Sequence, residues 1–149
     1  MMEYFITEVE FGTPEYHDTI LLRDGILRKP LNLEFIEDQL ASEFDSYHLA
    51  IYNRSLEMLG CLVLKPISHD IIKMRQVAID ENCQGRGLGK RLVKFSEAYA
   101  RQKGFQNIEL HARESAVPFY LKMGYKKIGK TFKEVGIPHF KMVKSITHE

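Results

Sequence analysis

Three glycines at alternate positions, Gly85, Gly87 and Gly89, mark the stretch of the chain whose chemistry is easiest to anticipate. Without Cβ atoms, the backbone N–H groups of such a loop can converge on an anion at close range. Apolar residues at helical spacing begin at Leu88, so a helix N-terminus with partial positive charge lies beside the loop. Lys90 and its basic neighbours add mobile cations. The pattern favours a phosphate-binding loop, although a tight strand-to-helix turn would use the same glycines.

Two better-known phosphate loops do not fit this spacing. A nucleotide P-loop requires Ser or Thr after Gly-Lys, whereas Arg91 follows Lys90 here. A dinucleotide fingerprint requires G-x-G-x-x-G and an acidic residue at the end of the next strand, about 20 positions later, whereas this loop reads G-x-G-x-G and no acid ends that strand. A nucleotide-phosphate protein is therefore disfavoured.

The elements that must position the loop follow from hydrophobic periodicity and from capping signals. Thr13-Pro14-Glu15 is typical of a helix start, and Gly104 stands where a helix would place its C-terminal capping glycine. Apolar and polar residues alternate over 107–113, as they do in a strand. Strands are expected over 3–11, 47–53, 57–65, 71–80, 107–113, 124–133 and 138–146, and helices over 14–28, 32–41, from Leu88 to the cap at Gly104, and from a cap at Ser115 to Gly124.

The resulting order of elements is β-αα-βββ-α-β-α-ββ. Helices are segregated among mostly antiparallel strands, and the strand-loop-helix-strand passage predicts one parallel crossover. In the long helix, the apolar residues at helical spacing are expected to face the core: Leu88, Leu92, Phe95 and Tyr99.

Composition restricts the class of protein. Of the 149 residues 44% are hydrophobic, which suffices for one core, and we expect a single domain over 1–149. A net charge of +1 gives no global steering toward nucleic acid or anionic membrane. Cys61 and Cys83 form neither a CxxC pair nor a Cys/His cluster, so neither a metal site nor a disulfide framework is expected. The acidic start and the lack of a long apolar run predict a soluble, cytoplasmic protein.

The glycine loop and a second motif together resemble the GCN5-related N-acetyltransferases (GNAT). The family signature Gln/Arg-x-x-Gly-x-Gly/Ala at a strand end is matched at Gln84, Gly87 and Gly89. The family's aromatic-Tyr pair before Gly-Phe/Tyr is matched by Phe119-Tyr120 and Gly124-Tyr125, at the separation from the loop that the family shows. The resemblance covers nearly the whole chain. It implies an α+β fold in which a central mixed, mostly antiparallel sheet is flanked by helices.

The resemblance also implies acetyl-CoA as co-substrate. Backbone amides of the loop would bind the pyrophosphate, the strand at 76–79 would pair with the pantetheine arm, and Tyr120 would be the general acid for the leaving thiolate. Arg113 departs from the family, because many members place there an Asn that contacts the coenzyme; a guanidinium could reach a carbonyl or phosphate oxygen instead. The coenzyme-binding residues implied in this way are Gln76, Val77, Ala78, Ile79, Gln84, Gly85, Arg86, Gly87, Leu88, Gly89, Lys90, Arg113 and Tyr120.

Acyl transfer to an amine also needs a base, because an alkylammonium with a pKa of about 10.4 must lose its proton before it attacks. Members often carry a Glu on the central strand, but residues 71–79 contain no carboxylate. Glu134 and His139 are the catalytic candidates beside Tyr120; their segment resembles the Glu-x-Gly-Ile-Pro-His stretch of a bacterial branch that includes ElaA-like proteins. A hairpin with a surface Glu and a hydrogen-bonded His explains the segment equally well. His111 is a third candidate, for which a structural role is the more common one.

These inferences predict an acetyl-CoA-dependent N-acetyltransferase that moves an acetyl group to an amine of a small molecule or peptide by direct attack. A non-catalytic regulatory module that binds acyl-CoA is the alternative, favoured only by the missing strand carboxylate. An amine-bearing acceptor is the expected partner, with a homodimer left open and neither nucleic acid nor membrane expected. A cationic acceptor is suggested by a group of acids, which a solvated helix face explains more simply: Glu34, Glu37, Asp38, Glu43 and Asp45.

Overall fold

The computed structural model describes residues 3–28 and 40–147. The predicted order of elements is confirmed within these ranges, and the helix expected over 32–41 lies outside them except for Leu40 and Ala41. The elements are β1 (Tyr4–Val9), α1 (Pro14–Arg23), the π-helical turn η1 (Asp24–Arg28), the 3₁₀ turn η3 (Ser42–Asp45), β2 (Tyr47–Asn53), β3 (Met58–Pro66), β4 (Ile71–Ile79), the 3₁₀ turn η4 (Glu81–Cys83), α3 (Leu88–Gln102), β5 (Asn107–Arg113), the 3₁₀ turn η5 (Glu114–Ala116), α4 (Val117–Lys122), β6 (Lys126–Glu134) and β7 (Ile137–Ser145).

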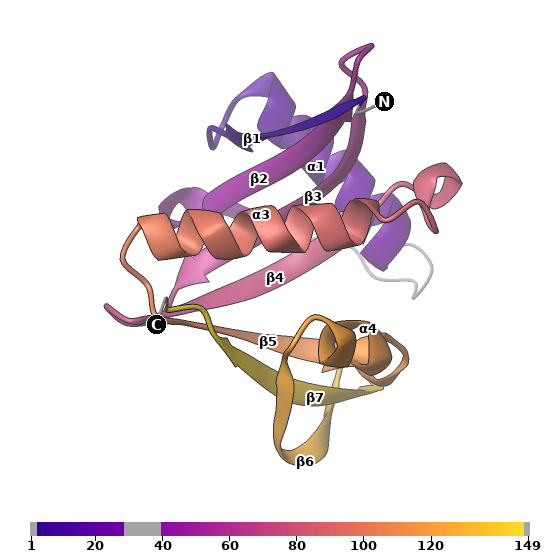
Figure 1. Cartoon of the computed structure of the whole chain (residues 1–149). Helices are drawn as coiled ribbons and strands as arrows, with labels where there is room; N and C mark the ends of the chain where they lie inside the picture. The colour runs from indigo at the N-terminus through magenta and orange to yellow at the C-terminus, as the bar shows by residue number, and fades with distance from the viewer. Residues whose placement is uncertain (1–2, 29–39, 148–149) are drawn as a thin grey trace.

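Seven strands form one sheet in the order β1-β2-β3-β4-β5-β7-β6 (Figure 1). Only β4 and β5 pair in parallel among these described strands, and every other neighbouring pair is antiparallel. The parallel pair requires a crossover, which α3 supplies between the two strands. The predicted mixed, mostly antiparallel sheet is therefore confirmed.

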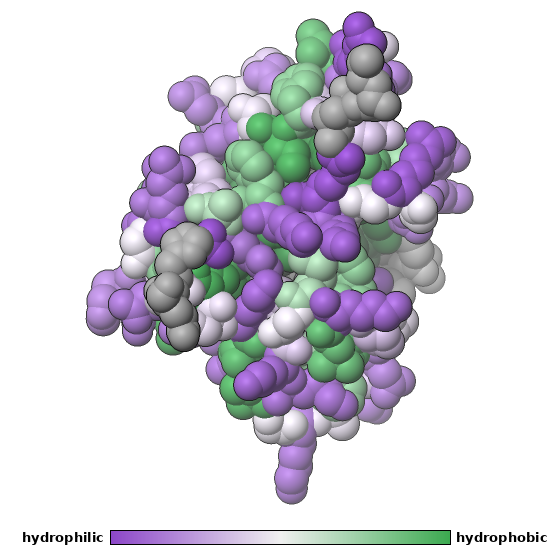
Figure 2. Space-filling model, in the orientation of Figure 1, coloured by the Kyte–Doolittle hydropathy of each residue, from purple (hydrophilic) through white to green (hydrophobic). Residues whose placement is uncertain are grey.

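Helices cover both faces of the sheet. α3 and α4 pack on one face over the larger apolar cluster, which includes Leu49, Ile72 and Leu110. α1 covers the other face over a smaller cluster around Val9 and Ala50, and Figure 1 shows it behind the strands with α3 in front. The surface where α3 crosses the sheet is mostly hydrophilic (Figure 2). No helix in the described ranges is both long and apolar enough to cross a membrane.

The long helix α3 buries a stripe that differs partly from the predicted one. Leu88 and Leu92 are buried as expected, but Phe95 is 37% exposed. Successive residues of a helix point about 100° apart, so the stripe that runs through Val93 and Ala100 leaves Phe95 beyond its edge. The predicted core position of Phe95 is therefore wrong.

A buried polar cluster fixes α4 to α3 and β7. Lys144 donates to both carboxylate oxygens of Glu97, at 3.0 and 3.1 Å, and to the carbonyl of Met123 at 2.7 Å. Tyr125 donates its hydroxyl proton to Glu97 at 2.9 Å. Because Met123 caps the C-terminal end of α4, these bonds hold the helix that carries Tyr120.

The start of α4 differs from the prediction that Ser115 caps it. Ser115 lies within η5, and Ala116 occupies the N-cap of α4 without a side-chain hydrogen bond. Pro118 falls in the first turn of α4, as expected, where its missing N–H costs nothing. The η5 turn takes the place of a side-chain cap because it leads the chain directly from β5 into the helix.

The helix predicted over 14–28 divides into α1 and η1. Thr13 caps it as predicted, accepting a hydrogen bond from the N–H of Tyr16 at 3.2 Å. At the other end the guanidinium of Arg23, which is fully buried, donates to both oxygens of Glu43 at 2.9 and 3.0 Å. Tyr16 donates its hydroxyl proton to the same carboxylate at 2.8 Å. This buried ion pair joins α1 to η3 and so fixes the helical segment that continues into η1.

The ion pair predicts a measurable loss of stability in Glu43→Gln. That variant removes the carboxylate charge that faces the buried guanidinium of Arg23, so the free energy of unfolding should fall by about 3–5 kcal/mol. Glu3→Gln is the control, because its pair with Arg54 lies on the surface, with side chains 38% and 75% exposed, and should cost under about 1 kcal/mol. Urea unfolding at neutral pH measures the free energy of unfolding of both variants. Equal losses in the two variants would contradict a stabilising role for the buried pair.

The contribution of this ion pair to the free energy of unfolding depends on pH, and the direction of the change can be derived. Burial opposes ionisation of Glu43, but the hydrogen bonds and charge of Arg23 outweigh it and hold the pKa of the carboxyl below its ordinary value. The stabilisation is therefore complete above the ordinary carboxyl pKa and is lost as the pH falls through the lower pKa of the folded state.

Candidate active site

The two parallel strands at the centre of the sheet separate before they end. Backbone pairing of β4 with β5 extends only as far as Met74 and Leu110, and Figure 1 shows the two strands diverging toward α4. A cleft of about 280 Å³ lies at this opening. Its walls come from η1, β4, β5, η5, α4 and the turn between β6 and β7.

A β-bulge distorts β4 where it lines the cleft. Cys61 and Val63 of β3 pair with Ala78 and Arg75, so two residues of β4 lie opposite one of β3. Gln76 has a φ of 55°, and its Oε1 is buried without a hydrogen-bond partner among the described residues. A non-glycine residue with positive φ is strained, and the surrounding fold must hold it in place. Such residues, like β-bulges, are common at ligand-binding sites. The bulge turns polar groups of β4 out of the sheet ladder and toward the cleft.

The residues expected to pair with the pantetheine arm fall at different places along β4. Gln76 and Val77 line the cleft. Ala78 and Ile79 pair with β3 and continue toward the glycine loop, whose Gln84 side chain donates to the carbonyl of Ile79 at 3.1 Å. The strand therefore leads from the cleft directly to the loop.

The glycine loop lies at the N-terminal end of α3. Gly85 and Gly87 have φ values of 83° and 78°, a conformation that glycine adopts without strain. Gly87 is the N-cap of α3 and offers no side-chain acceptor, so the first N–H groups of the helix are available to an anion. The loop is exposed from Gln84 to Gly87, Lys90 is exposed, and Leu88 turns its side chain into the core.

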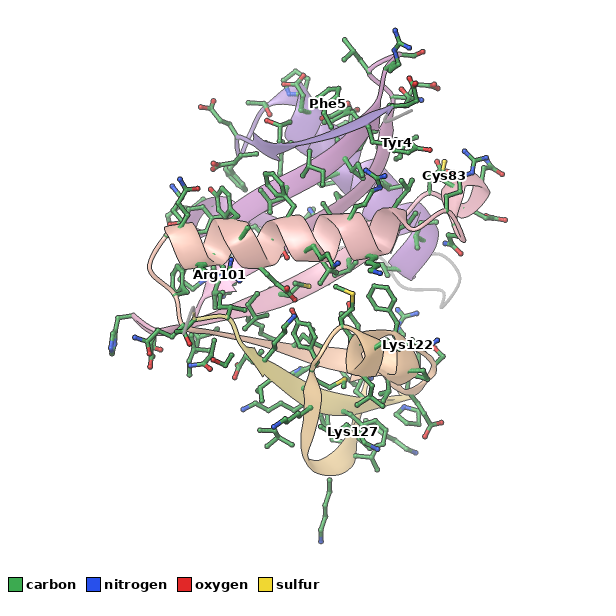
Figure 3. All side chains as sticks on the ribbon, viewed as in Figure 1. Tyr4, Phe5, Cys83, Arg101, Lys122 and Lys127 are labelled. Atoms are coloured by element: carbon green, nitrogen blue, oxygen red, sulfur yellow. The ribbon has the colours of Figure 1, made fainter. Side chains whose placement is uncertain are left out.

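Tyr120 reaches the cleft from α4. Its side chain is 7% exposed and packs in the core, yet it lines the cleft. Burial raises its pKa to about 12, and within residues 3–28 and 40–147 its hydroxyl makes no hydrogen bond that would hold it elsewhere. Phe119 lies against the start of α3, where a Cβ on Gly89 would be 3.7 Å from the Phe119 ring. Figure 3 labels Cys83 beside the loop and Lys122 on α4, both at the end toward which β4 and β5 diverge.

A carboxylate between two histidines stands at another wall of the cleft. Glu134 Oε1 is 3.0 Å from His111 Nδ1, and Glu134 Oε2 is 3.6 Å from His139 Nε2. The turn that carries Glu134 is tight, because Val135 and Gly136 both have positive φ, 46° and 75°. This two-residue turn joins β6 to β7, which begins at Ile137 and includes Pro138.

The hydrogen bonds assign protons to the two histidines. His139 Nδ1 is 2.8 Å from the carbonyl of Ile137, which can only accept, so this nitrogen carries hydrogen. His111 Nδ1 lies 3.0 Å from Glu134 and 3.4 Å from the ammonium of Lys73. The carboxylate of Glu134 is the closer partner and can only accept a hydrogen bond. We therefore assign a proton to Nδ1 of His111, which donates it to Glu134, and leave the lone pair on Nε2. Burial opposes ionisation of Glu134, but its bond to His111 outweighs it and lowers the carboxyl pKa.

Two arginines also line the cleft. Arg113 Nη2 donates to the carbonyl of Leu27 at 3.3 Å, which connects the end of β5 to η1. Arg75 is half-buried and forms no hydrogen bond or ion pair with any described residue. Sequence reasoning assigned no role to Arg75 or Lys73; the available signal was their alternation with the buried Ile72 and Met74 on a strand that ends at the loop.

The cleft reaches both faces of the sheet. Val77, Leu110 and Tyr120 belong to the side that α3 and α4 cover. Arg75 and His111 alternate with core residues and therefore point to the opposite side. Two molecules can thus meet in the cleft from opposite faces.

Of the acids proposed for a cationic acceptor, the two that the structure describes do not line this cleft. Glu43 is buried in its pair with Arg23, so its predicted role in binding an acceptor is wrong. Asp45 is exposed at the end of η3, and Glu34, Glu37 and Asp38 lie outside the described residues.

Comparison with known proteins agrees with this architecture. Protein YyaT of Bacillus subtilis (strain 168), which is uncharacterized, is 28% identical over 144 residues, covering 89% of this chain and 90% of its own. A GNAT family acetyltransferase from Elizabethkingia anophelis, solved with acetyl-CoA bound, has a TM-score of 0.75 at 18% identity and covers 97% of this chain and 99% of its own. Escherichia coli ElaA has a TM-score of 0.76 at 18% identity, covering 95% and 99%. At these identities the two structures show a shared fold.

The family match covers most of the chain. The family model described as the acetyltransferase (GNAT) domain matches residues 23–146, from the end of α1 to just beyond β7. This protein therefore belongs to the GNAT family of acetyltransferases.

Proposed function

We propose that this protein transfers the acetyl group of acetyl-CoA to an amine by direct attack in the cleft between β4 and β5. The observation that carries the proposal is the continuity of one path: the bulged edge of β4 and Tyr120 border the same opening, and β4 leads from it to the glycine loop, where Gln84 bonds to Ile79. The acetyl-CoA found in the related E. anophelis structure supports the choice of co-substrate.

The coenzyme would follow this path from its phosphates to its thioester. The pyrophosphate would accept hydrogen bonds from the loop and the start of α3, with Arg86 and Lys90 nearby. The pantetheine arm would pair with the edge of β4 that β5 leaves unpaired beyond Met74. A carbonyl held at the bulge near Gln76 would receive backbone N–H donors, which stabilise the negative charge that develops on its oxygen during attack.

The amine would enter from the face that carries His111. Glu134 orients His111 and stabilises its protonated form, while the free Nε2 accepts the ammonium proton, as in other carboxylate–histidine pairs. Nε2 of His139 lies 3.6 Å from the other carboxylate oxygen and can donate to it only when the ring carries both protons. These groups supply the base that β4 itself lacks.

Tyr120 would act at the departing sulfur. A thiol has an ordinary pKa of about 8.5, well below the value of about 12 that burial gives Tyr120. Complete proton transfer from the phenol would therefore be uphill, so its contribution is a hydrogen bond donated to the thiolate as the C–S bond breaks. A binding module without catalysis has no use for this donor or for the base, which disfavours the alternative function.

Substitution of Gly87 tests the pyrophosphate site. Coenzyme A should raise the free energy of unfolding by about 2.7 kcal/mol at a hundredfold excess over Kd. A Cβ at Gly87 would meet nothing within 4 Å in the protein, so Gly87→Ala should cost only the strain of its positive φ, about 1 kcal/mol, and should abolish the coenzyme effect.

Gly104→Ala is the matched control for Gly87→Ala. Gly104 lies beyond the other end of α3, with a φ of +97° and nothing within 4 Å of a Cβ, so the strain is similar while the loop is untouched. Thermal unfolding with and without coenzyme A compares the two variants. An equal coenzyme shift in both would exclude the loop as the binding site.

Tyr120→Phe tests the sulfur donor. The hydroxyl has no partner within the described ranges, so its removal should leave folding and coenzyme affinity nearly unchanged while kcat falls about 100-fold, at the low end for general-acid help. Tyr125→Phe is the control: it removes a hydroxyl bonded to buried Glu97, so it should lower stability and preserve kcat. Thiol release measures turnover; full activity of Tyr120→Phe would mean that the ring only packs.

Glu134→Gln tests the base through the pH profile. The variant should lose kcat most at low pH and approach wild type as the amine loses its proton unaided. Although burial opposes ionisation, the hydrogen bond and charge of His111 lower the carboxyl pKa of Glu134, so Glu134 is ionised at neutral pH and remains so to a lower pH than an ordinary carboxyl. Glu109→Gln, which disrupts the pair between Glu109 on β5 and Lys141 on β7, is the control. Parallel profiles of the two variants would remove Glu134 from the mechanism.

A further inference from the structure

Among the described residues, most charged side chains at the cleft are positive. Arg75 and Arg113 line it, and Lys73 lies beside His111 at 3.4 Å. Glu134 is the one acidic residue among the described lining residues. Its charge is already engaged by His111 and His139. The cleft therefore offers cations to whatever molecule occupies it.

Arg75 is the cation best placed to bind a ligand. It follows Met74, the last residue of β4 that pairs with β5, so it stands where the opening begins. Its neighbour Met74 is buried on the α3 side, which directs Arg75 to the face that carries His111. A half-buried guanidinium without a partner among the described residues has lost part of its hydration without compensation.

Arg113 stands close enough to contribute to the same site. A guanidinium has five N–H donors, and only one bond, from Nη2 to the Leu27 carbonyl, is made to the described residues. That bond holds the side chain at the cleft and leaves further donors available. Planar guanidinium groups match the oxygens of carboxylates and phosphates in two-point contacts.

We propose that the acceptor amine belongs to a small molecule that also carries an anionic group, a carboxylate or a phosphate, close to its amine. Arg75 binds that group with help from Arg113, and the amine then faces His111 and Glu134. The inference rests on the proposed acetyl transfer and names its substrate class. The cleft volume of about 280 Å³ suits a small acceptor.

The same charges predict that a polycation is a poor acceptor. A second ammonium would meet Arg75, Arg113 and Lys73 without a free carboxylate among the described lining residues. For an acceptor whose anion is bound by Arg75, the nearby positive charges instead lower the pKa of its ammonium and favour the neutral, attacking amine.

The experiment compares matched acceptors that differ only in the anion. Amino acids of several side-chain sizes are paired with their primary carboxamides, and phosphoethanolamine is paired with ethanolamine. Measured by thiol release, kcat/KM should be at least tenfold higher for the anionic member of each pair in one of the two series. The series that shows this difference identifies the bound anion as a carboxylate or a phosphate. Carboxamide amines are less basic, so intrinsic reactivity at neutral pH works against this result.

Arg75→Gln should lower kcat/KM at least tenfold for the preferred anionic acceptors and less than twofold for their neutral partners. Arg54→Gln, which removes an exposed arginine from the turn between β2 and β3, should change neither value. The stabilisation by coenzyme A should be the same in both variants. A uniform loss for all acceptors in Arg75→Gln would overturn the inference.

Failure of this inference can be distinguished from failure of acetyl transfer. If coenzyme A binds and neutral amines are acetylated as well as anionic ones, the transferase stands and the anion site is wrong. Where no amine in the panel is acetylated, N-acetylated amino acids or N-acetylated phosphoethanolamine should still raise the unfolding temperature above that with coenzyme A alone, and their neutral counterparts should not. No rise from any anionic product overturns the proposal.

Discussion

The parting of β4 and β5 beyond Met74 and Leu110 is the constraint on which the rest of the site depends. A parallel pair that stayed in register would satisfy its own backbone groups and leave no space between the strands. Once the strands diverge, the edge of β4 needs another partner, and an extended arm with amide groups is the kind of ligand that meets this need. The bulge at Gln76 belongs to the same departure from regular pairing.

An opening in the middle of a sheet must be held by the elements around it. On one face, the pair between Arg23 and Glu43 fixes the helical segment that ends near Leu27, whose carbonyl meets Arg113. On the other, the bonds from Lys144 to Glu97 and Met123 hold the helix of Tyr120. In both devices a buried carboxylate, Glu43 or Glu97, is paired with a cation, and separating the pair would leave the carboxylate charge in the interior.

The two faces of the opening differ in chemistry. The α3 side combines a glycine loop with a buried phenol, which suits a phosphate-bearing thioester. The opposite side combines arginines with a carboxylate between two histidines, which suits the recognition and deprotonation of an amine. Because the cleft passes between the strands, the two sets of groups would act from opposite faces in the proposed reaction and would not compete for the same volume.

The sequence by itself determined the order of elements, the loop at Gly85–Gly89 and the position of Tyr120 on a short helix, because periodicity, capping and glycine spacing are local properties. It also singled out Glu134 and His139 as neighbours along the chain. Only the tertiary structure decided that His111 lies 3.0 Å from Glu134, that Glu43 forms a buried ion pair with Arg23 and that Arg75 faces the cleft. These contacts join residues far apart in the chain, so they depend on strand order, register and the divergence of β4 from β5, which no local pattern records.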